Sequence, residues 1–221
     1  MLSGKRILFI SIWSWEGAGE EAILMELLAG ANEIVWVSPF GSLRGNLLPD
    51  FKPVRAGLTV YRPGVNFLPL PTLQRFNEWR RLTQVLMYLL EKDFKPDLVW
   101  LGDPMAGRFA EHFRRKGAPA LYYGPPDGMK VPREEEEALT AAVDLLIFST
   151  EKQYRRFAGS GRAVLVEAAD IPSAGAEVTG AENPTDASAE ANKQLEEIFM
   201  ADLRERLEKI SSLIEDNLTG K

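Results

Sequence analysis

The sequence predicts an α/β fold: a doubly wound, Rossmann-like parallel sheet with helices on both faces. Apolar runs of strand length alternate with helical stretches along residues 6–166. The first run, residues 6–12, is apolar on both faces and enters a helix through the glycine loop 13–19, as in the first half of a βαβ unit. In such a sheet the first strand lies at the centre and ligands bind beyond its carboxyl end.

The remaining elements follow from their periodicity and from their glycine and proline boundaries. Helices are expected at residues 20–29, 73–92, 106–116, 134–143 and 150–158. Strands are expected at residues 33–38, 58–62, 65–68, 98–101, 120–123, 144–149 and 163–166. These alternating elements make up a first domain, residues 1–172.

The long helix 73–92 shows one apolar stripe, which is expected to face the core. The stripe consists of Leu73, Phe76, Trp79, Leu82, Leu86 and Leu89. The arginines Arg75, Arg80 and Arg81 are expected on the solvated face. Together with Trp79 they allow at most peripheral contact with an anionic membrane surface.

After residue 172 the composition changes to small, polar and aperiodic, which predicts a flexible linker over residues 173–191. Residues 192–221 then form an amphipathic helix, whose stripe includes Met200, Leu203, Leu207, Ile210 and Ile214. A stripe this wide needs a covering surface. We expect the helix to pack back on the first domain or on a second copy of the chain.

Composition excludes several classes of function. The chain of 221 residues has no cysteine and one histidine, so no metal site is expected. Residues 1–171 carry 21 basic and 21 acidic groups and residues 172–221 carry 5 and 11, so no basic face for nucleic acid is expected. The sequence shows no signal peptide and no membrane-spanning run. The expected location is cytoplasmic, with peripheral contact at the inner membrane face left open.

The loop before the first helix and the helix's first residues match the dinucleotide pattern G-x-G-x-x-G/A from Gly17 to Ala22. Glu16, Glu20 and Glu21 surround the place where a pyrophosphate would bind, and their charges would repel it. No acid follows the second strand to hold a ribose. An NAD-dependent oxidoreductase is therefore the weaker interpretation, and the acids are more simply explained by the helix dipole.

Two further acids, Asp103 and Asp127, follow directly after predicted strands. Carboxylates in such loops can accept a proton from a hydroxyl group or bind a sugar. They can equally cap a helix or fix a turn. The residues alone leave both interpretations open.

Residues 5–172 resemble the N-terminal domain of GT-B-fold glycosyltransferases, in particular glycosyltransferase family 4. The resemblance rests on five segments in the family's order: GAGEEAILMELLA, KPDLVWLGDP, LYYGPPDG, AAVDLLIFST and AVLVEAADIP. It implies that Asp127 orients or deprotonates an acceptor hydroxyl. It also implies an acceptor side formed by Trp13, Glu16, Gly17, Gly19, Asp103 and Tyr123.

The sequence departs from the family at several positions. Ala18 replaces a loop glycine, Gly124 replaces an acid, and Glu167 with Ala168 replaces Asn-Gly. The usual C-terminal nucleotide-sugar domain is missing between the first domain and the last helix.

The resemblance therefore implies the acceptor-binding half of a glycosyltransferase that is inactive as an isolated chain. No tightly bound cofactor is expected, and a nucleotide sugar would be the donor once a second domain completes the site. Expected partners are a sugar or lipid-linked acceptor, and either a second GT-B half or a homodimer through the last helix. The alternative is a non-catalytic binding or scaffold module on the same fold.

Overall fold

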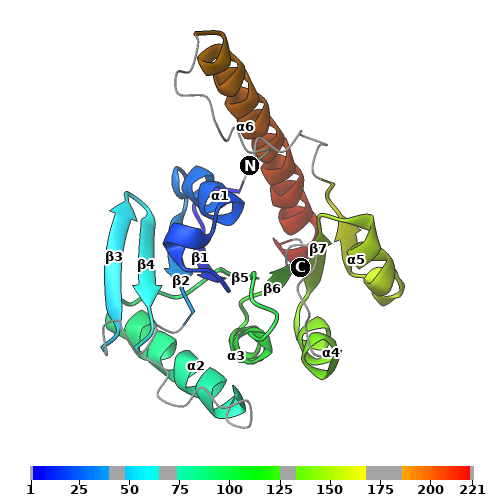
Figure 1. The fold of residues 1–221 in the computed structure, drawn as a ribbon. Helices are drawn as coiled ribbons and strands as arrows, with labels where there is room; N and C mark the ends of the chain where they lie inside the picture. Colours follow the sequence, from blue (N-terminus) through cyan, green and yellow to red (C-terminus); the bar gives the residue numbers. More distant parts are fainter. Residues whose placement is uncertain (1, 40–47, 65–73, 125–132, 168–185, 220–221) are drawn as a thin grey trace.

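The structure is a computed structural model and describes residues 2–39, 48–64, 74–124, 133–167 and 186–219. Within these ranges eight strands form one sheet in the order β3-β4-β2-β1-β5-β6-β7-β8 (Figure 1). The strands are β1 (Arg6–Ile10), β2 (Glu33–Val37), β3 (Asp50–Arg55), β4 (Leu58–Arg62), β5 (Leu98–Leu101), β6 (Ala120–Tyr123), β7 (Leu145–Phe148) and β8 (Ala163–Leu165). Only β3 and β4 pair antiparallel. The doubly wound sheet predicted from the sequence is confirmed.

Helices cover both faces of the sheet, as the sequence predicts. Figure 1 shows α1 and α6 on one face and α2, α3 and α4 on the other. The helices are α1 (Glu20–Ala29), α2 (Gln74–Glu91), α3 (Gly107–Arg115), α4 (Arg133–Ala142), α5 (Glu151–Phe157) and α6 (Asp186–Ile214). The short helical turns are η1 (Trp15–Gly17), η3 (Ala158–Ser160) and η4 (Glu215–Thr219).

The central strand β1 contributes to a hydrophobic core on each side of the sheet. Ile7 and Phe9 pack in the core under α1 and α6, while Leu8 and Ile10 pack in the core under α2 and α3. Successive side chains of a strand point to opposite faces. A strand covered on both faces must therefore be apolar throughout, which explains the unbroken apolar run of β1.

The path of the chain creates a switch point next to β1. From β1 the chain runs outward through β2 to β4, and after α2 it returns to β5 on the other side of β1. The loops that follow β1 and β5 therefore leave in opposite directions from adjacent strand ends. Ligands of open α/β sheets bind in the crevice that this reversal forms.

Strand β3 was not predicted from the sequence. It contains Pro53, it pairs only with β4, and most of its residues are exposed. Proline and polar residues are tolerated on an edge strand, where one side of the backbone has no partner. The strand expected at residues 65–68 lies outside the described residues.

The buried face of α2 is rotated from the predicted one. Its deeply buried apolar residues are Leu82, Val85, Tyr88 and Leu89, whereas Trp79 is 52% exposed. The expected burial of Trp79 is therefore wrong. The rotation also brings Arg81, which was expected in solvent, to the interior, where it is 7% exposed.

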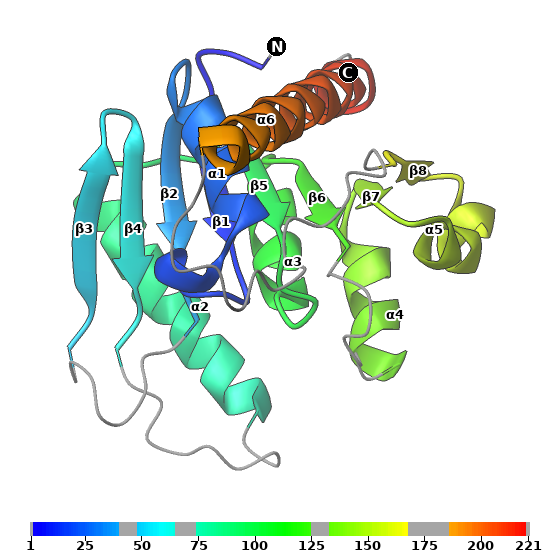
Figure 2. The same ribbon diagram turned by 45° about the horizontal axis from the view of Figure 1, so that its top comes forward.

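The last helix is present, as the sequence predicts, but α6 begins at Asp186, inside the range expected as linker. Its residues Leu203, Leu207, Ile210 and Ile214 are at most 2% exposed. They belong to the same core as the apolar side chains of α1. Figure 2 shows α6 running alongside α1.

None of the helices in the described ranges is both long and apolar enough to cross a membrane.

Candidate functional site

The candidate site lies at the switch point, where the loops after β1 and β5 are bonded to each other. The backbone N–H groups of Gly102 and Asp103 both donate to the carbonyl oxygen of Ile10, at 2.9 and 3.1 Å. Gly19, with a φ of 50°, gives the backbone the left-handed turn that leads into α1. We call Ser11, Glu21, Arg81, Gly102 and Asp103 the switch-point cluster.

Glu21 is a buried carboxyl group inside this cluster. It comes from the first turn of α1 and is 9% exposed. The Ser11 hydroxyl donates to its Oε2 at 2.9 Å, and a Cβ added at Gly102 would lie 3.1 Å from its Oε1. Burial raises the pKa of Glu21 to about 7, the charges of Glu20 and Asp103 act in the same direction, and the hydrogen bond from Ser11 opposes them.

Arg81 of α2 joins the ends of three strands. Its guanidinium forms a buried ion pair with Asp103 after β5. It also donates to the carbonyl oxygens of Ser11 after β1, at 2.9 Å, and Ser38 after β2, at 3.3 Å. The other carboxylate oxygen of Asp103 accepts the N–H of Met105 at 2.9 Å. Both oxygens of Asp103 are thus engaged within the chain.

The glycine loop presents one aromatic side chain to solvent and packs another, partly buried, against the sheet. Trp13 is 39% exposed, and its backbone N–H donates to the Ser11 hydroxyl at 2.9 Å. Trp15 packs edge-on against Trp36 of β2 with 5.1 Å between ring centroids. This packing anchors the loop and leaves Trp13 as its accessible aromatic ring.

The other predicted site residues of the first loop lie around this cluster. Glu16 forms an ion pair with Arg62 at the end of β4. Its pKa is lowered by a backbone hydrogen bond and by Arg62. Gly17 has space for a side chain, since a Cβ there would come no closer than 3.5 Å to Ser14.

Tyr123 lies on the α1 side of the sheet. It is 8% exposed, and its hydroxyl donates to Glu20 at 3.5 Å. Arg206 of α6 donates to the same oxygen of Glu20 at 2.8 Å. Burial raises the pKa of Tyr123, and the Glu20 charge adds to the rise. Asp127 lies outside the described residues.

Gly124, which stands where the resemblance has an acid, is tightly packed. A Cβ at this position would lie 2.6 Å from Cδ1 of Phe148. The ring of Phe148 in turn stacks on Phe157, with 5.1 Å between centroids. A larger residue at position 124 would therefore have to displace a packed aromatic pair.

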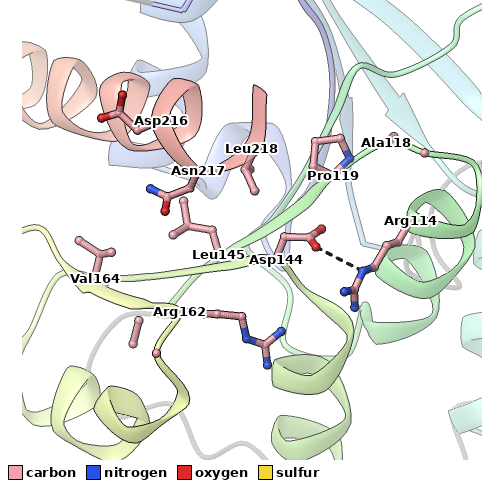
Figure 3. Close-up of a pocket in the computed structure, with 13 residues that line it drawn as sticks. Arg114, Ala118, Pro119, Asp144, Leu145, Arg162, Val164, Asp216, Asn217 and Leu218 are labelled. Carbon is pink, nitrogen blue, oxygen red and sulfur yellow. Dashed lines mark ion pairs between the residues drawn. The ribbon is translucent and has the colours of Figure 1, made fainter. Parts of the chain in front are cut away.

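A cavity of about 780 Å³ lies at the opposite edge of the sheet, between the amino ends of β6 to β8 and the turn η4 that follows α6 (Figure 3). Arg114 and Asp144 pair across it at 3.2 Å. The guanidinium of Arg162 donates to the carbonyl oxygens of Thr140 and Val143 at the end of α4. These contacts satisfy helix-end carbonyls and join elements, so we assign the charged groups of this cavity to the fold.

Four members of the switch-point cluster were missed as site residues: Ser11, Glu21, Arg81 and Gly102. Ser11 is a polar residue at the end of an otherwise apolar strand, and Arg81 lies four residues before the buried Val85. Both signals are present in the sequence. Among the described residues no group of three or more aspartate, glutamate or histidine side chains could hold a metal ion.

No family model and no curated protein sequence matches the chain. Solved structures do. A form of sucrose-phosphate synthase from Thermosynechococcus elongatus, described by the segments 27–220 and 406–426, has a TM-score of 0.53 at 12% identity, with 89% of this chain and 98% of that chain covered. Sucrose-phosphate synthase from the same organism in a longer chain has a TM-score of 0.54 at 12% identity, with 74% and 48% covered.

The chain thus has the Rossmann-like fold of GT-B glycosyltransferases and spans about half the length of the longer synthase chain. At these identities the likeness shows the fold alone.

Proposed function

We propose that this chain is the acceptor-binding half of a GT-B glycosyltransferase resembling family 4, which transfers a sugar from a nucleotide sugar. The observation that supports this most is the arrangement at the switch point. An exposed tryptophan, Trp13, adjoins a polar cluster at adjacent strand ends, on a fold found in glycosyltransferases. Aromatic rings with nearby carboxyl and hydroxyl groups suit a sugar, which has apolar C–H faces and many hydroxyls.

The reaction would form a glycosidic bond to an acceptor hydroxyl as the bond between the sugar and the nucleoside diphosphate breaks. The acceptor proton needs a base, and the resemblance assigns that role to Asp127. Asp103 is less suited to it, because Arg81 and the N–H of Met105 already engage both of its oxygens.

Neutralising the departing diphosphate requires free cations. Among the described residues Arg81 pairs with Asp103, and Arg62 pairs with Glu16. Only about 20 residues separate β8 from α6, too few for a second domain. We therefore expect the donor-binding domain elsewhere, either in a longer protein or on a partner chain.

A scaffold role is the second candidate, and one observation favours it. Both oxygens of Asp103 and one oxygen of Glu21 are engaged in contacts within the chain, as expected if this edge of the sheet is filled rather than open. A nicotinamide cofactor is disfavoured, because Glu16, Glu20 and the buried Glu21 surround the start of α1.

Nuclear magnetic resonance on the isotope-labelled chain separates the two candidates. The chain would be titrated with monosaccharides and their phosphates, and we expect shifts of the backbone amides at residues 11–21 and 102–106. Trp13→Ala should weaken this binding about tenfold, in line with the loss of a stacking ring.

Trp79→Ala is the matched control, since it removes an exposed tryptophan from α2, and it should leave binding unchanged. If no sugar or sugar phosphate shifts those amides, the scaffold role replaces the acceptor role.

A further inference from the structure

Four arginines around the switch-point cluster are paired with carboxylates. Besides the pairs Arg81–Asp103 and Arg62–Glu16, Arg108 of α3 lies 3.6 Å from Glu78 of α2. Arg206 of α6 pairs with Glu20 at 2.8 Å. Each of these four described arginines therefore offers little charge to a bound anion.

After this matching Glu21 is left without a cation among the described residues, and Glu78, the partner of Arg108, still has one unbonded oxygen there. Glu21 accepts a hydrogen bond from a hydroxyl and has no ion pair within the described part of the chain. Glu78 has one buried oxygen without a hydrogen-bond partner among the described residues. Burial raises the pKa of both groups to about 7, so each exchanges between its neutral and its charged form near neutral pH.

The usual position for a bound phosphate is also taken. The N-terminus of a helix that follows a glycine loop attracts anions through its free N–H groups. Here the first turn of α1 carries Glu20 and Glu21, and Glu21 folds back into the cluster. A phosphate at this position would meet carboxylates, and like charges brought together repel each other.

One further buried group at this edge lacks a hydrogen-bond partner among the described residues. The hydroxyl of Ser38, which is 2% exposed, has no partner within the described ranges. Ser38 adjoins the cluster through its carbonyl oxygen, which accepts from Arg81 at 3.3 Å. Buried hydroxyls normally have a partner, and a ligand hydroxyl could supply one here.

We infer that the acceptor taken at the switch point is an uncharged, hydroxyl-rich molecule, a free sugar or a neutral polyol, and not a sugar phosphate. This rests on the proposed acceptor role of the same site. In this respect the chain would differ from its structural neighbour sucrose-phosphate synthase, which is named for a sugar phosphate. Protonated or charged, Glu21 can bond to a hydroxyl, whereas its charged form repels a phosphate.

Paired titrations test the inference. Glucose and glucose 6-phosphate, fructose and fructose 6-phosphate, and inorganic phosphate alone are compared at the amides of residues 11–21 and 102–106. We expect the neutral sugar of a pair to bind at least about tenfold more tightly than its phosphate. Tighter binding of the phosphate at those amides overturns the inference and leaves the acceptor site standing. If no sugar or sugar phosphate shifts those amides, both this inference and the proposed acceptor role are wrong.

Charge-neutralising variants provide the second arm. Glu21→Gln combined with Glu78→Gln keeps the side-chain sizes and should raise the affinity for the 6-phosphate about tenfold relative to the affinity for the neutral sugar. Glu16→Gln, on the exposed side of the loop, should act in the same direction by releasing Arg62. Its exposure means that folding is not at risk.

Glu33→Gln is the control, because Glu33 is an exposed acid at the amino end of β2, away from the cluster. The inference would be contradicted if the ratio of the affinity for the neutral sugar to that for its phosphate stayed unchanged in both the double variant and Glu16→Gln.

Discussion

Arg81 lies where three strand ends meet, and its contacts explain why the loops at the switch point are held together. It pairs with Asp103 after β5 and donates to the carbonyl oxygens of Ser11 after β1 and Ser38 after β2. A planar guanidinium with five donors suits such a junction better than lysine does. The residue thus acts on the site through the loops that it positions.

Removing Arg81 should be strongly destabilising. Arg81→Met leaves Asp103 buried without its cation, and breaking a buried pair in this way costs about 3–5 kcal/mol. Arg81→Met combined with Asp103→Asn should cost less, because no buried charge is left alone. Urea denaturation of the variants measures both effects.

The control for this prediction is Arg62→Met, which breaks the exposed pair with Glu16. Exposed pairs contribute about 0–1 kcal/mol. Equal losses of unfolding free energy in Arg81→Met and Arg62→Met would show that the buried pair does not hold the loops.

Glu21 should make stability depend on pH. Its pKa is about 7 in the folded chain against an ordinary value of 4.5. Between these pH values the folded state keeps a proton that the unfolded state has lost, so stability falls as the pH rises from about 4.5 to about 7. The unfolding free energy lost over this pH range is up to about 3 kcal/mol. Glu78, with its pKa also raised to about 7, acts in the same direction.

Urea midpoints measured from pH 5 to pH 8 test this dependence. Glu21→Gln should flatten the profile in part, and Glu21→Gln with Glu78→Gln should flatten it further. If the wild-type chain is as stable at pH 8 as at pH 5, the burial of these carboxyl groups does not have the predicted effect.

Single residues were the hardest feature to predict. Glu21 and Arg81 are charged, and charged residues on helices are usually solvated. Their burial depends on tertiary partners, Ser11 and Asp103, that lie 10 and 22 residues away in the chain. Periodicity along one helix contains no information on such partners.

At the scale of elements, α6 is attached to α1 by both apolar and charged contacts. Leu203, Leu207 and Ile210 are buried in the core that contains α1. Arg206, 3% exposed, links Glu20 at the start of α1 to Asp202 one turn earlier on α6, at 2.8 and 2.9 Å. The helix therefore adjoins the first turn after the glycine loop.

Charges introduced into the interface between α1 and α6 should destabilise the fold. Burying a leucine or isoleucine is worth roughly 1.5–3 kcal/mol each, and a buried unpaired charge costs more. Leu207→Asp with Ile210→Asp should therefore lower the melting temperature by well over about 10 °C. Ile198→Asp on the same helix is the control, because Ile198 is 54% exposed. An unchanged melting temperature in the double variant would mean that α6 does not stabilise the fold.

The elements themselves could largely be predicted, since buried strands and amphipathic helices show their own periods. The exceptions have physical causes. Strand β3 contains a proline and is mostly exposed, so neither composition nor alternation indicates it. Helix α6 starts earlier than expected because residues such as Asp186 and Ala187 are compatible with either a helix or a linker.

At the scale of the molecule, the βαβ pattern predicted the class of sheet, its central strand and the edge at which the switch-point loops meet. The proposed function rests on that edge and on a fold shared with glycosyltransferases. Asp127, the proposed base, lies outside the described residues, so its place beside the cluster stays a prediction.

The central claim is that this chain binds an acceptor but lacks the means to use a donor. The most direct test is turnover: release of nucleoside diphosphate from a panel of UDP- and GDP-sugars, with and without monosaccharides, alongside calorimetric titration of each donor. We predict weak or no donor binding and no release by the chain alone. Tight donor binding, or release that is abolished by Asp127→Asn, would show that the chain is a complete enzyme and would contradict the account.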